Sequence, residues 1–402
     1  MTELTAAEKR FIQQNLQINV QTLLLRKHEE TIRWKEVAAQ IQARQKAAQK
    51  LPTWYANPDL LFPPTLSVEQ ASSERTARYK ASLVNGHRLL DLTGGMGVDS
   101  WAFAQRLDQV TYVEQQPALA ALAAHNFPIL GMTNVEIHPQ DGLSYLQSMI
   151  DPVDWIYLDP ARRNEHGGRV VRLEDCVPDV TATGLLNRLL AKADRLLLKA
   201  SPLMDIDAAV GRLQQVEAVH VVAVQNEVKE ILFIISRLPL STDEVSIAAV
   251  NLTEQGDGPA VTFRRAEERA VPVTFGNPLR YLYEPNAALM KAGAFRVVAA
   301  RYGLQKLAPH SHLYTTDALV WPFPGRVFDL MAVSRPDRKE LRTVLPDLKA
   351  NLTVRNFPQP AEELRKKLGL REGGDIFVLA TSLLNGDKRL LITRKVTNVQ
   401  SS

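Results

Sequence analysis

Short apolar runs recur through the middle of the chain and alternate with longer stretches of helical spacing. Runs of this kind, rich in branched and aromatic residues, are typical of strands buried in a parallel sheet. Their alternation with helices predicts an α/β, Rossmann-like core with a seven-stranded sheet, at residues 81–240. The predicted strands are Leu89–Leu92, Thr111–Val113, Val135–His138, Trp155–Leu158, Arg195–Lys199, Ala218–Val224 and Ile231–Ile235.

The segment before this core, residues 1–80, has a helical pattern. Apolar side chains recur at helical spacing over residues 1 to about 50, with a second helix expected at 32–50. Four prolines then interrupt the pattern and predict a linker or an extended stretch. These prolines are Pro52, Pro58, Pro63 and Pro64.

A short helix is expected immediately before the first core strand. Ser72 or Ser73 is placed to cap its N-terminus. Two interpretations remain open for this helix. Thr76, Tyr79 or Lys80 lines the mouth of an active site, or the helix is purely structural.

Strand patterns return behind the core. Residues 245–250 and 260–265 alternate like a hairpin around Gly256-Asp257-Gly258, and a helix at 286–292 and a mixed segment at 296–300 follow. We place this hairpin and small module at 241–323. The remaining residues, 324–402, predict a small α+β domain with strands at 327–333, 352–354, 375–381 and 389–393 and helices at 339–345 and 361–368.

The turn after the first core strand is chemically the most informative segment. Leu89 to Asp99 reads as a strand, a glycine turn and the start of a helix. Glycines allow positive φ and close approach of a ligand, and the helix start presents unpaired N–H groups. Glu114 ends the next strand, where an acid can bind both hydroxyls of a ribose. An adenosine-type cofactor site is predicted at Asp91, Thr93, Gly94, Gly95, Gly97, Asp99 and Glu114.

The spacing of the glycines favours one adenosine cofactor over another. A dinucleotide fingerprint needs a third small residue, glycine or alanine, where this chain has Ser100. Asp91 suits a cationic ligand better than a pyrophosphate. S-adenosylmethionine (SAM) carries a sulfonium and an ammonium group. The pattern Asp91-x-x-Gly94-x-x-Gly97 with Glu114 resembles class I SAM-dependent methyltransferases.

Two later loops extend this resemblance. In the family an acid after the third strand binds the adenine amino group, which implies cofactor roles for Asp141 and Gly142. The loop after the fourth strand, Asp159-Pro160-Ala161-Arg162-Arg163, is similar to the substrate-side motif Asp/Asn-Pro-Pro-aromatic and departs from it at its last two positions. The resemblance implies catalytic roles for Asp159, Pro160 and Arg162.

The departures leave the acceptor open. Without the aromatic residue that stacks on a flipped base, amine methylation is possible but not indicated. Arg162 and Arg163 either bind phosphate or carboxylate in bidentate fashion or pair with an acid such as Glu165 or Glu174. Lys199, after the fifth strand, either orients an anionic substrate or caps the sheet edge.

Cysteine and histidine usage adds little chemistry. Methylation at C5 of a pyrimidine normally needs a cysteine nucleophile. The single cysteine, Cys176, fits a small buried hydrophobe better, and its chemical role stays open. One cysteine cannot form an internal disulfide, which favours a reducing cytoplasm. The scattered histidines, including His310 and His312, lack partners at ligand spacing, so no metal site is predicted.

The bulk composition is that of a soluble globular protein of several domains. Of 402 residues, 45% are hydrophobic and 23% are charged. No apolar stretch approaches the roughly 18 residues that span a membrane. The first residues lack the features of a signal peptide. A cytoplasmic protein without a membrane segment is expected.

Charge is unevenly distributed along the chain. Residues 331–402 hold 14 Lys and Arg against 8 Asp and Glu, a net charge of +6, whereas the whole chain carries +4. Clustered cations indicate a polyanion partner, or simply a solvated basic surface. Arg365, Lys366 and Lys367 are the candidate phosphate contacts.

A narrower resemblance covers the C-terminal part of the chain. Asn356-Phe357-Pro358, Glu362–Leu368 and Glu372–Asp375 are similar to the THUMP-like domain that ends a family of bacterial class I SAM-dependent methyltransferases. Tyr281–Pro285 and its surroundings are similar to the ferredoxin-like module of that family. THUMP domains bind RNA, so the resemblance implies a methyltransferase of structured RNA, tRNA or rRNA. The alternatives are a protein or small-molecule acceptor, or a non-catalytic RNA-binding module, and the oligomeric state is not predicted.

Overall fold

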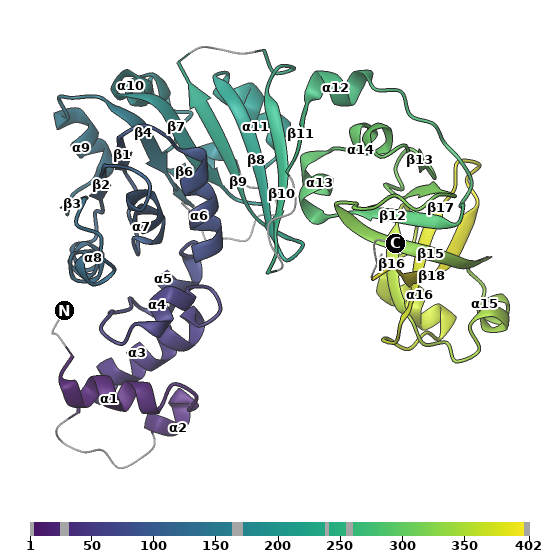
Figure 1. Ribbon diagram of the computed structural model, residues 1–402, viewed down its shortest axis with the longest axis horizontal. Coiled ribbons are helices and arrows are strands. Elements are labelled where there is room, and N and C mark those ends of the chain that lie inside the picture. The colour runs from purple at the N-terminus through teal and green to yellow at the C-terminus, as the bar shows by residue number, and fades with distance from the viewer. Residues whose placement is uncertain (1–3, 25–31, 163–171, 238–240, 255–259, 398–402) are drawn as a thin grey trace. The chain divides into compact units, whose positions relative to one another are not determined.

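The computed structural model describes residues 4–24, 32–162, 172–237, 241–254 and 260–397 (Figure 1). It divides into two compact units, the first made of residues 1–218 and 230–240 and the second of residues 219–229 and 241–402. Within the described ranges, no helix is both long and apolar enough to cross a membrane.

The largest sheet contains every strand predicted for the core. Its strands are β1 (Arg88–Asp91), β2 (Gln109–Val113), β3 (Val135–His138), β4 (Val153–Leu158), β7 (Ala193–Ala200), β8 (Val216–Val224), β9 (Glu227–Ser236), β10 (Ser246–Leu252) and β11 (Val261–Arg264). Among the described residues their order is β11-β10-β8-β9-β7-β4-β1-β2-β3. The pairs between β3 and β7 are parallel, and β9 joins β7 antiparallel. This arrangement confirms the Rossmann-like fold class.

The helices of the first unit follow the predicted alternation with the strands. The core helices are α7 (Val98–Ala104), α8 (Pro117–Ile129), α9 (Gly142–Ser148), α10 (Leu185–Lys192) and α11 (Ile206–Leu213). The N-terminal helices are α1 (Ala6–Gln14), α2 (Val20–Leu24), α3 (Trp34–Ala47), α4 (Pro52–Ala56), α5 (Thr65–Gln70) and α6 (Glu74–Leu83). Ser73 caps α6 by accepting a hydrogen bond from the backbone N–H of Thr76, as predicted.

The prediction of a linker or extended stretch holds only in part: α4 begins at Pro52, residues 57–64 contain no helix or strand, and α5 follows Pro64. Pro52 occupies the first turn of α4, where a backbone N–H would have no helical partner. The buried guanidinium of Arg44 donates hydrogen bonds to four carbonyls of the following segment, including those of Tyr55 and Leu60. Tertiary contacts therefore hold the end of α4 and the irregular residues that follow it.

The N-terminal helices pack on the core through α8. Leu122 joins a buried cluster that includes Ile12, Val37 and Leu61. The buried side chain of Asn126 also bonds both the N–H and the carbonyl of Leu61, at 2.9 and 2.8 Å. These contacts attach the first sixty residues to the same unit as the core.

The second unit contains another mixed sheet. Its strands are β12 (Tyr281–Pro285), β13 (Gln305–Lys306), β14 (Tyr314–Thr316), β15 (Gly325–Ser334), β16 (Asn351–Arg355), β17 (Ile376–Ser382) and β18 (Lys388–Lys395), in the order β13-β14-β12-β15-β18-β17-β16 within the described chain. Its helices are α12 (Arg265–Ala270), α13 (Ala287–Ala292), α14 (Arg296–Arg301), α15 (Arg338–Val344) and α16 (Ala361–Leu368). The predicted hairpin β10–β11 forms, the predicted strands β17 and β18 pair antiparallel, and the segment expected to be mixed at 296–300 is helical. The predicted turn at Gly256-Asp257-Gly258 lies outside the described residues.

Candidate active site

The carboxyl ends of β1, β4 and β7 meet at one edge of the large sheet. Asp91 lies opposite Tyr157, and Leu158 lies opposite Leu198. The parallel register therefore places the next residues, Asp159 and Lys199, beside each other. Ligands of open α/β sheets bind outside this edge, so the register alone brings the loops after β1 and β4 to one site.

The glycine loop after β1 is shaped by close packing. Gly97 has φ +88°, and a Cβ there would lie 2.8 Å from the ring of Phe127. A Cβ on Gly94 would overlap the ring of Tyr112, whose hydroxyl donates to the carbonyl of Gly95 at 2.6 Å. Side chains larger than hydrogen are excluded at both positions, because the loop packs directly on these two rings. Gly95, between them, is part-exposed, and its Cβ position meets only the carbonyl of Thr93 at 3.8 Å.

Asp91 lies beneath this loop with only 1% of its surface exposed. Its Oδ1 accepts from the backbone N–H of Thr93 at 2.9 Å, and its Oδ2 accepts from the hydroxyl of Ser100 at 2.5 Å. Burial raises the pKa of Asp91 to about 7, although both hydrogen bonds act in the opposite direction. Asp91 therefore holds the loop in shape, and its predicted contact with a cationic ligand stays a prediction.

Glu114 follows β2 and faces the same loop. One carboxylate oxygen accepts from the N–H of Gly95 at 2.8 Å, and the other accepts from the N–H of Gln116 at 2.8 Å. Each carboxylate oxygen has two lone pairs, so both keep capacity to accept a further hydrogen bond. The two ribose hydroxyls are groups of the right kind for this carboxylate.

Asp141 and Gly142 start α9 next to the glycine loop. Asp141 caps the helix by accepting from the backbone N–H of Ser144 at 2.8 Å, and it is exposed. A Cβ on Gly142 would lie 2.5 Å from the carbonyl oxygen of Leu92, so a glycine is needed where α9 meets the loop. The structure thus gathers the predicted cofactor residues around residues 91–97, with the exception of Asp99.

Thr93 joins the cofactor loop to the predicted substrate loop. Its hydroxyl oxygen accepts from the backbone N–H of Asp159 at 2.8 Å. Oδ2 of Asp159 in turn accepts from Nζ of Lys199 at 2.5 Å. Lys199 therefore pairs with the substrate-loop acid, which neither of its predicted roles anticipated.

The substrate loop continues past a half-buried Pro160 into a two-residue strand. β5 (Ala161–Arg162) pairs antiparallel with β6 (Cys176–Val177), which the short 3₁₀-helix Leu173–Asp175 precedes. Cys176 is buried, and its Sγ donates to the carbonyl of Arg172 at 3.6 Å.

The predicted partners of the two loop arginines are only partly described. Arg163 and Glu165 lie outside the described residues, as does the side chain of Arg162. Glu174, one possible partner of these arginines, pairs with Arg212 at 3.2 Å. The phosphate or carboxylate contacts of Arg162 and Arg163 stay predictions.

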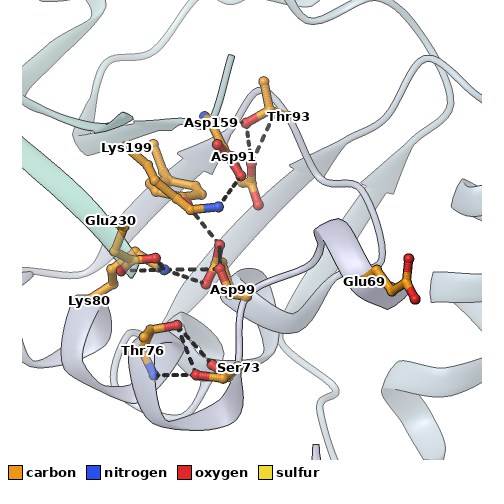
Figure 2. A network of polar contacts seen from close by, with 12 residues as sticks. Glu69, Ser73, Thr76, Lys80, Asp91, Thr93, Asp99, Asp159, Lys199 and Glu230 are labelled. Atoms are coloured by element: carbon orange, nitrogen blue, oxygen red, sulfur yellow. Dashed lines mark hydrogen bonds and ion pairs between the residues drawn. The ribbon is translucent and has the colours of Figure 1, made fainter. Parts of the chain in front are cut away.

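A buried polar network lies behind Asp159 and Lys199 (Figure 2). Lys80, on α6, donates to both carboxylate oxygens of Glu230 at 2.9 Å and to the hydroxyl of Ser72 at 3.0 Å. Its Nζ lies 3.2 Å from Oδ1 of Asp99. Oδ2 of Asp99 accepts from the hydroxyls of Tyr157 at 2.7 Å and Ser72 at 2.8 Å. Asp99 was predicted to bind the cofactor; Oδ2 of its carboxylate is bonded to these protein groups, and its cofactor role stays a prediction.

Ionisation within the network follows its opposite charges. Burial by itself would raise the pKa of Asp99, but the ammonium groups of Lys80 and Lys199 lower it overall. Burial would likewise lower the pKa of Lys199, and the nearby carboxylates of Asp159, Glu230 and Asp99 reverse that effect and raise it. The two lysines are therefore charged partners of three carboxylates.

The sequence did not predict two members of this network, Glu230 and Tyr157, and it left the role of Lys80 open. Glu230 is an acid at the head of an otherwise apolar run, Ile231–Ile235, which is the signal that could have identified it. Tyr157 gave no signal, because an aromatic residue is ordinary in a buried strand. Lys80 is completely buried, so it lies under the site and does not line its mouth.

The candidate phosphate contacts belong to the second unit. Arg365, Lys366 and Lys367 form the last turn of α16, where cations also stabilise the helix end. Lys366 and Lys367 are exposed, and Arg365 pairs with Glu372 at 3.2 Å. In the part of the chain that the structure describes, no group of three or more His, Cys, Asp or Glu residues is arranged to hold a metal ion.

The chain is similar to known proteins in both sequence and structure. A ferredoxin-like domain family matches residues 281–324, and a family described as THUMP domain-like matches residues 325–395. The crystal structure of a candidate methyltransferase from Porphyromonas gingivalis superposes with a TM-score of 0.87 and 35% identity, over 97% of this chain and 98% of its own.

A further relative is similar over most of its length. It is an uncharacterised S-adenosylmethionine-dependent methyltransferase found in two strains of Mycobacterium tuberculosis, 26% identical over 321 residues. The match covers 79% of this chain and 83% of that protein.

Proposed function

Because this chain belongs to the family of SAM-dependent methyltransferases that includes the Porphyromonas gingivalis protein, we propose that it methylates structured RNA, tRNA or rRNA. The observation that carries the RNA substrate is the THUMP domain-like match at residues 325–395, on a tail with a net charge of +6 over residues 331–402. Clustered cations bind a phosphate backbone with little regard to sequence.

We propose that the loop from Asp91 to Gly97 holds SAM. Glu114 binds the ribose hydroxyls, and Asp141 binds the adenine amino group. The part-exposed Gly95 and the remaining acceptor capacity of Glu114 fit such a ligand. SAM supplies a methyl group on a good leaving group, so the protein has mainly to align the acceptor and exclude water.

The proposed division of labour follows the predicted domains. The core at 81–240 carries out the transfer, with Asp159, Pro160, Arg162, Arg163 and Lys199 on the acceptor side. The helices at 1–80, the module at 241–323 and the domain at 324–402 help to hold RNA. A cytoplasmic location is part of this proposal, since a single cysteine in 402 residues suits a reducing compartment.

The test compares nucleosides of bulk RNA from cells with and without this chain by mass spectrometry. One methylated nucleoside should be lost when the chain is absent and restored when it is supplied. Unchanged RNA nucleosides, together with methyl transfer to a protein or metabolite in extracts, would replace RNA as the substrate and leave the methyltransferase activity standing.

A further inference from the structure

The acceptor side of the site is built from lysines and carboxylates. Asp159 and Lys199 form its accessible end, with 37% and 14% of their side-chain surfaces exposed. Lys80 and Glu230 form its buried end, with 0% and 3% exposed. Residues 159–162 include no aromatic ring that could stack on a base.

Burying such a network carries a desolvation penalty, which suggests that the charges have a function. Removing one partner of a buried ion pair leaves the other charge buried and unpaired, whereas apolar side chains would fill the same space without that penalty. Here five charged side chains from α6, α7, β9 and the ends of β4 and β7 converge. Their combined effect is to fix Nζ of Lys199 against Asp159, at the edge where the acceptor must approach.

The charge balance of the network matches the arrival of a cation. Lys80 and Lys199 face Asp99, Asp159 and Glu230, which leaves one negative charge in excess. A sulfonium group nearby would balance that excess. It would also oppose the three carboxylates that raise the pKa of Lys199 in the site without SAM, because a like charge lowers the pKa of an amine.

The two main classes of acceptor make different demands on this site. An aromatic amine can attack first and lose its proton afterwards, so positioning by a carboxylate and a carbonyl is enough. A hydroxyl is a weaker nucleophile, and its proton must leave as the new bond forms. A lysine that can become neutral in the loaded site meets that demand.

We propose that the acceptor atom is a hydroxyl oxygen, in RNA the ribose 2′-hydroxyl, and that Asp159 and Lys199 bind this hydroxyl. This inference rests on the proposed RNA substrate. Lys199 first releases its proton to solvent. The hydroxyl oxygen then forms a bond to the methyl carbon as the carbon–sulfur bond breaks, and sulfur keeps that electron pair as a neutral thioether. The hydroxyl proton passes to Nζ of Lys199 and later returns to solvent.

The deeper residues act through Lys199. Lys80 neutralises Glu230 and Asp99, and these carboxylates set the electrostatic environment of Lys199. Because Lys80 is fully buried, it is a positioning residue.

The first experiment identifies the methylated atom. The full chain is incubated with isotopically labelled SAM and bulk RNA from cells that lack it, and the RNA is digested and analysed by mass spectrometry. We expect the label on ribose, in dinucleotides that resist alkaline hydrolysis. A label on a base would overturn the hydroxyl acceptor but keep the RNA substrate. No label in RNA would overturn the RNA substrate and, with it, this inference.

The second experiment tests Lys199 in the same assay. Lys199→Met should lose about 10²–10⁴-fold in the single-turnover rate, with SAM affinity within a few-fold of the parent. The parent rate should rise with pH toward a plateau, and this rise should vanish in the variant. Lys192→Met, which removes a lysine that bonds only the carbonyl of Met149 in the described structure, is the matched control and should keep the parent profile. A Lys199→Met variant with the parent rate and pH profile would overturn the assignment.

Discussion

At the scale of single residues, two buried aspartates have pKa values shifted in opposite directions. Asp91 and Asp99 stand at the two ends of the segment that contains the glycine loop, and both are buried. Asp91 receives hydrogen bonds from neutral groups, and burial raises its pKa to about 7. Asp99 lies against the ammonium of Lys80, which lowers its pKa despite burial. The neighbouring charge decides between the two outcomes.

The pKa of Asp91 predicts a pH-dependent stability. Its folded pKa of about 7 exceeds the reference value of 3.8, so its contribution is complete below about pH 4 and is lost as pH rises through 7. Asp91→Asn mimics the protonated acid. Its free energy of unfolding, compared with that of the parent, should therefore increase by about 2–3 kcal/mol from pH 5 to pH 8. Urea unfolding at several pH values measures this, and a pH-independent difference would contradict it.

A second prediction concerns the cofactor acid. Glu114→Ala removes the proposed acceptor of the ribose hydroxyls and should weaken SAM binding by about 1–3 kcal/mol. Isothermal titration calorimetry measures the affinity. Glu136→Ala changes a part-exposed carboxylate on β3, and its affinity should match the parent. Equal affinities in parent and Glu114→Ala would remove Glu114 from the site.

At the scale of elements, the site depends on how closely its loops approach one another. The glycine loop lies between α9, which meets Leu92 through Gly142, and Tyr112 on β2, which meets Gly94. Thr93 then bonds the loop after β4. The cofactor loop and the substrate loop are therefore in direct contact.

Two glycines provide a matched test of this packing. Gly94→Ala places a methyl group on the Tyr112 ring and should destabilise the fold by about 1–3 kcal/mol and weaken SAM binding. Gly211 lies inside α11 with open space around its Cβ position, so Gly211→Ala should be neutral or stabilise by roughly 0.5–1 kcal/mol. Thermal unfolding with and without SAM measures both, and equal effects would contradict the loop geometry.

At the scale of the whole molecule, two units have different charge and different proposed tasks. The first unit holds the candidate active site, and the second holds the ferredoxin-like and THUMP domain-like matches. β12 of the first match pairs with β15 of the second, so the two share one sheet. The basic residues of α16 belong to this second unit, apart from the residues proposed to bind SAM.

The last prediction tests that separation. Neutralising Arg365, Lys366 and Lys367 to Gln should weaken RNA binding and reduce its log–log salt slope by about 0.7–0.9 per lost phosphate contact. SAM affinity should not change. The control keeps the positive charges by exchanging arginine and lysine at the same three positions: Arg365→Lys, Lys366→Arg and Lys367→Arg. It should keep the salt slope of the parent. Filter binding over a salt series measures it, and an unchanged slope in the neutral variant argues against this surface.

The amino-acid sequence by itself determined the elements of the core and the order of its loops. The apolar runs, the glycine turn and the acid of Glu114 are local patterns, and local patterns express backbone preference and side-chain periodicity. The seven core strands and the cap at Ser73 could be predicted for that reason. The short helix α4 in the proline-rich segment could not, because Arg44 holds its end and the following residues through hydrogen bonds that the local pattern does not show.

Only the tertiary structure decided which charged side chains meet. Lys80 and Glu230 are 150 positions apart in the chain, and their contact requires α6 to pack on α7 and β9 to pair antiparallel with β7. The same packing places Asp99, which the sequence predicted only as a cofactor ligand, 3.2 Å from the ammonium of Lys80. Register between strands and burial between helices are properties of the assembled fold, so the ionic network that supports Lys199 is encoded in no single segment of the sequence.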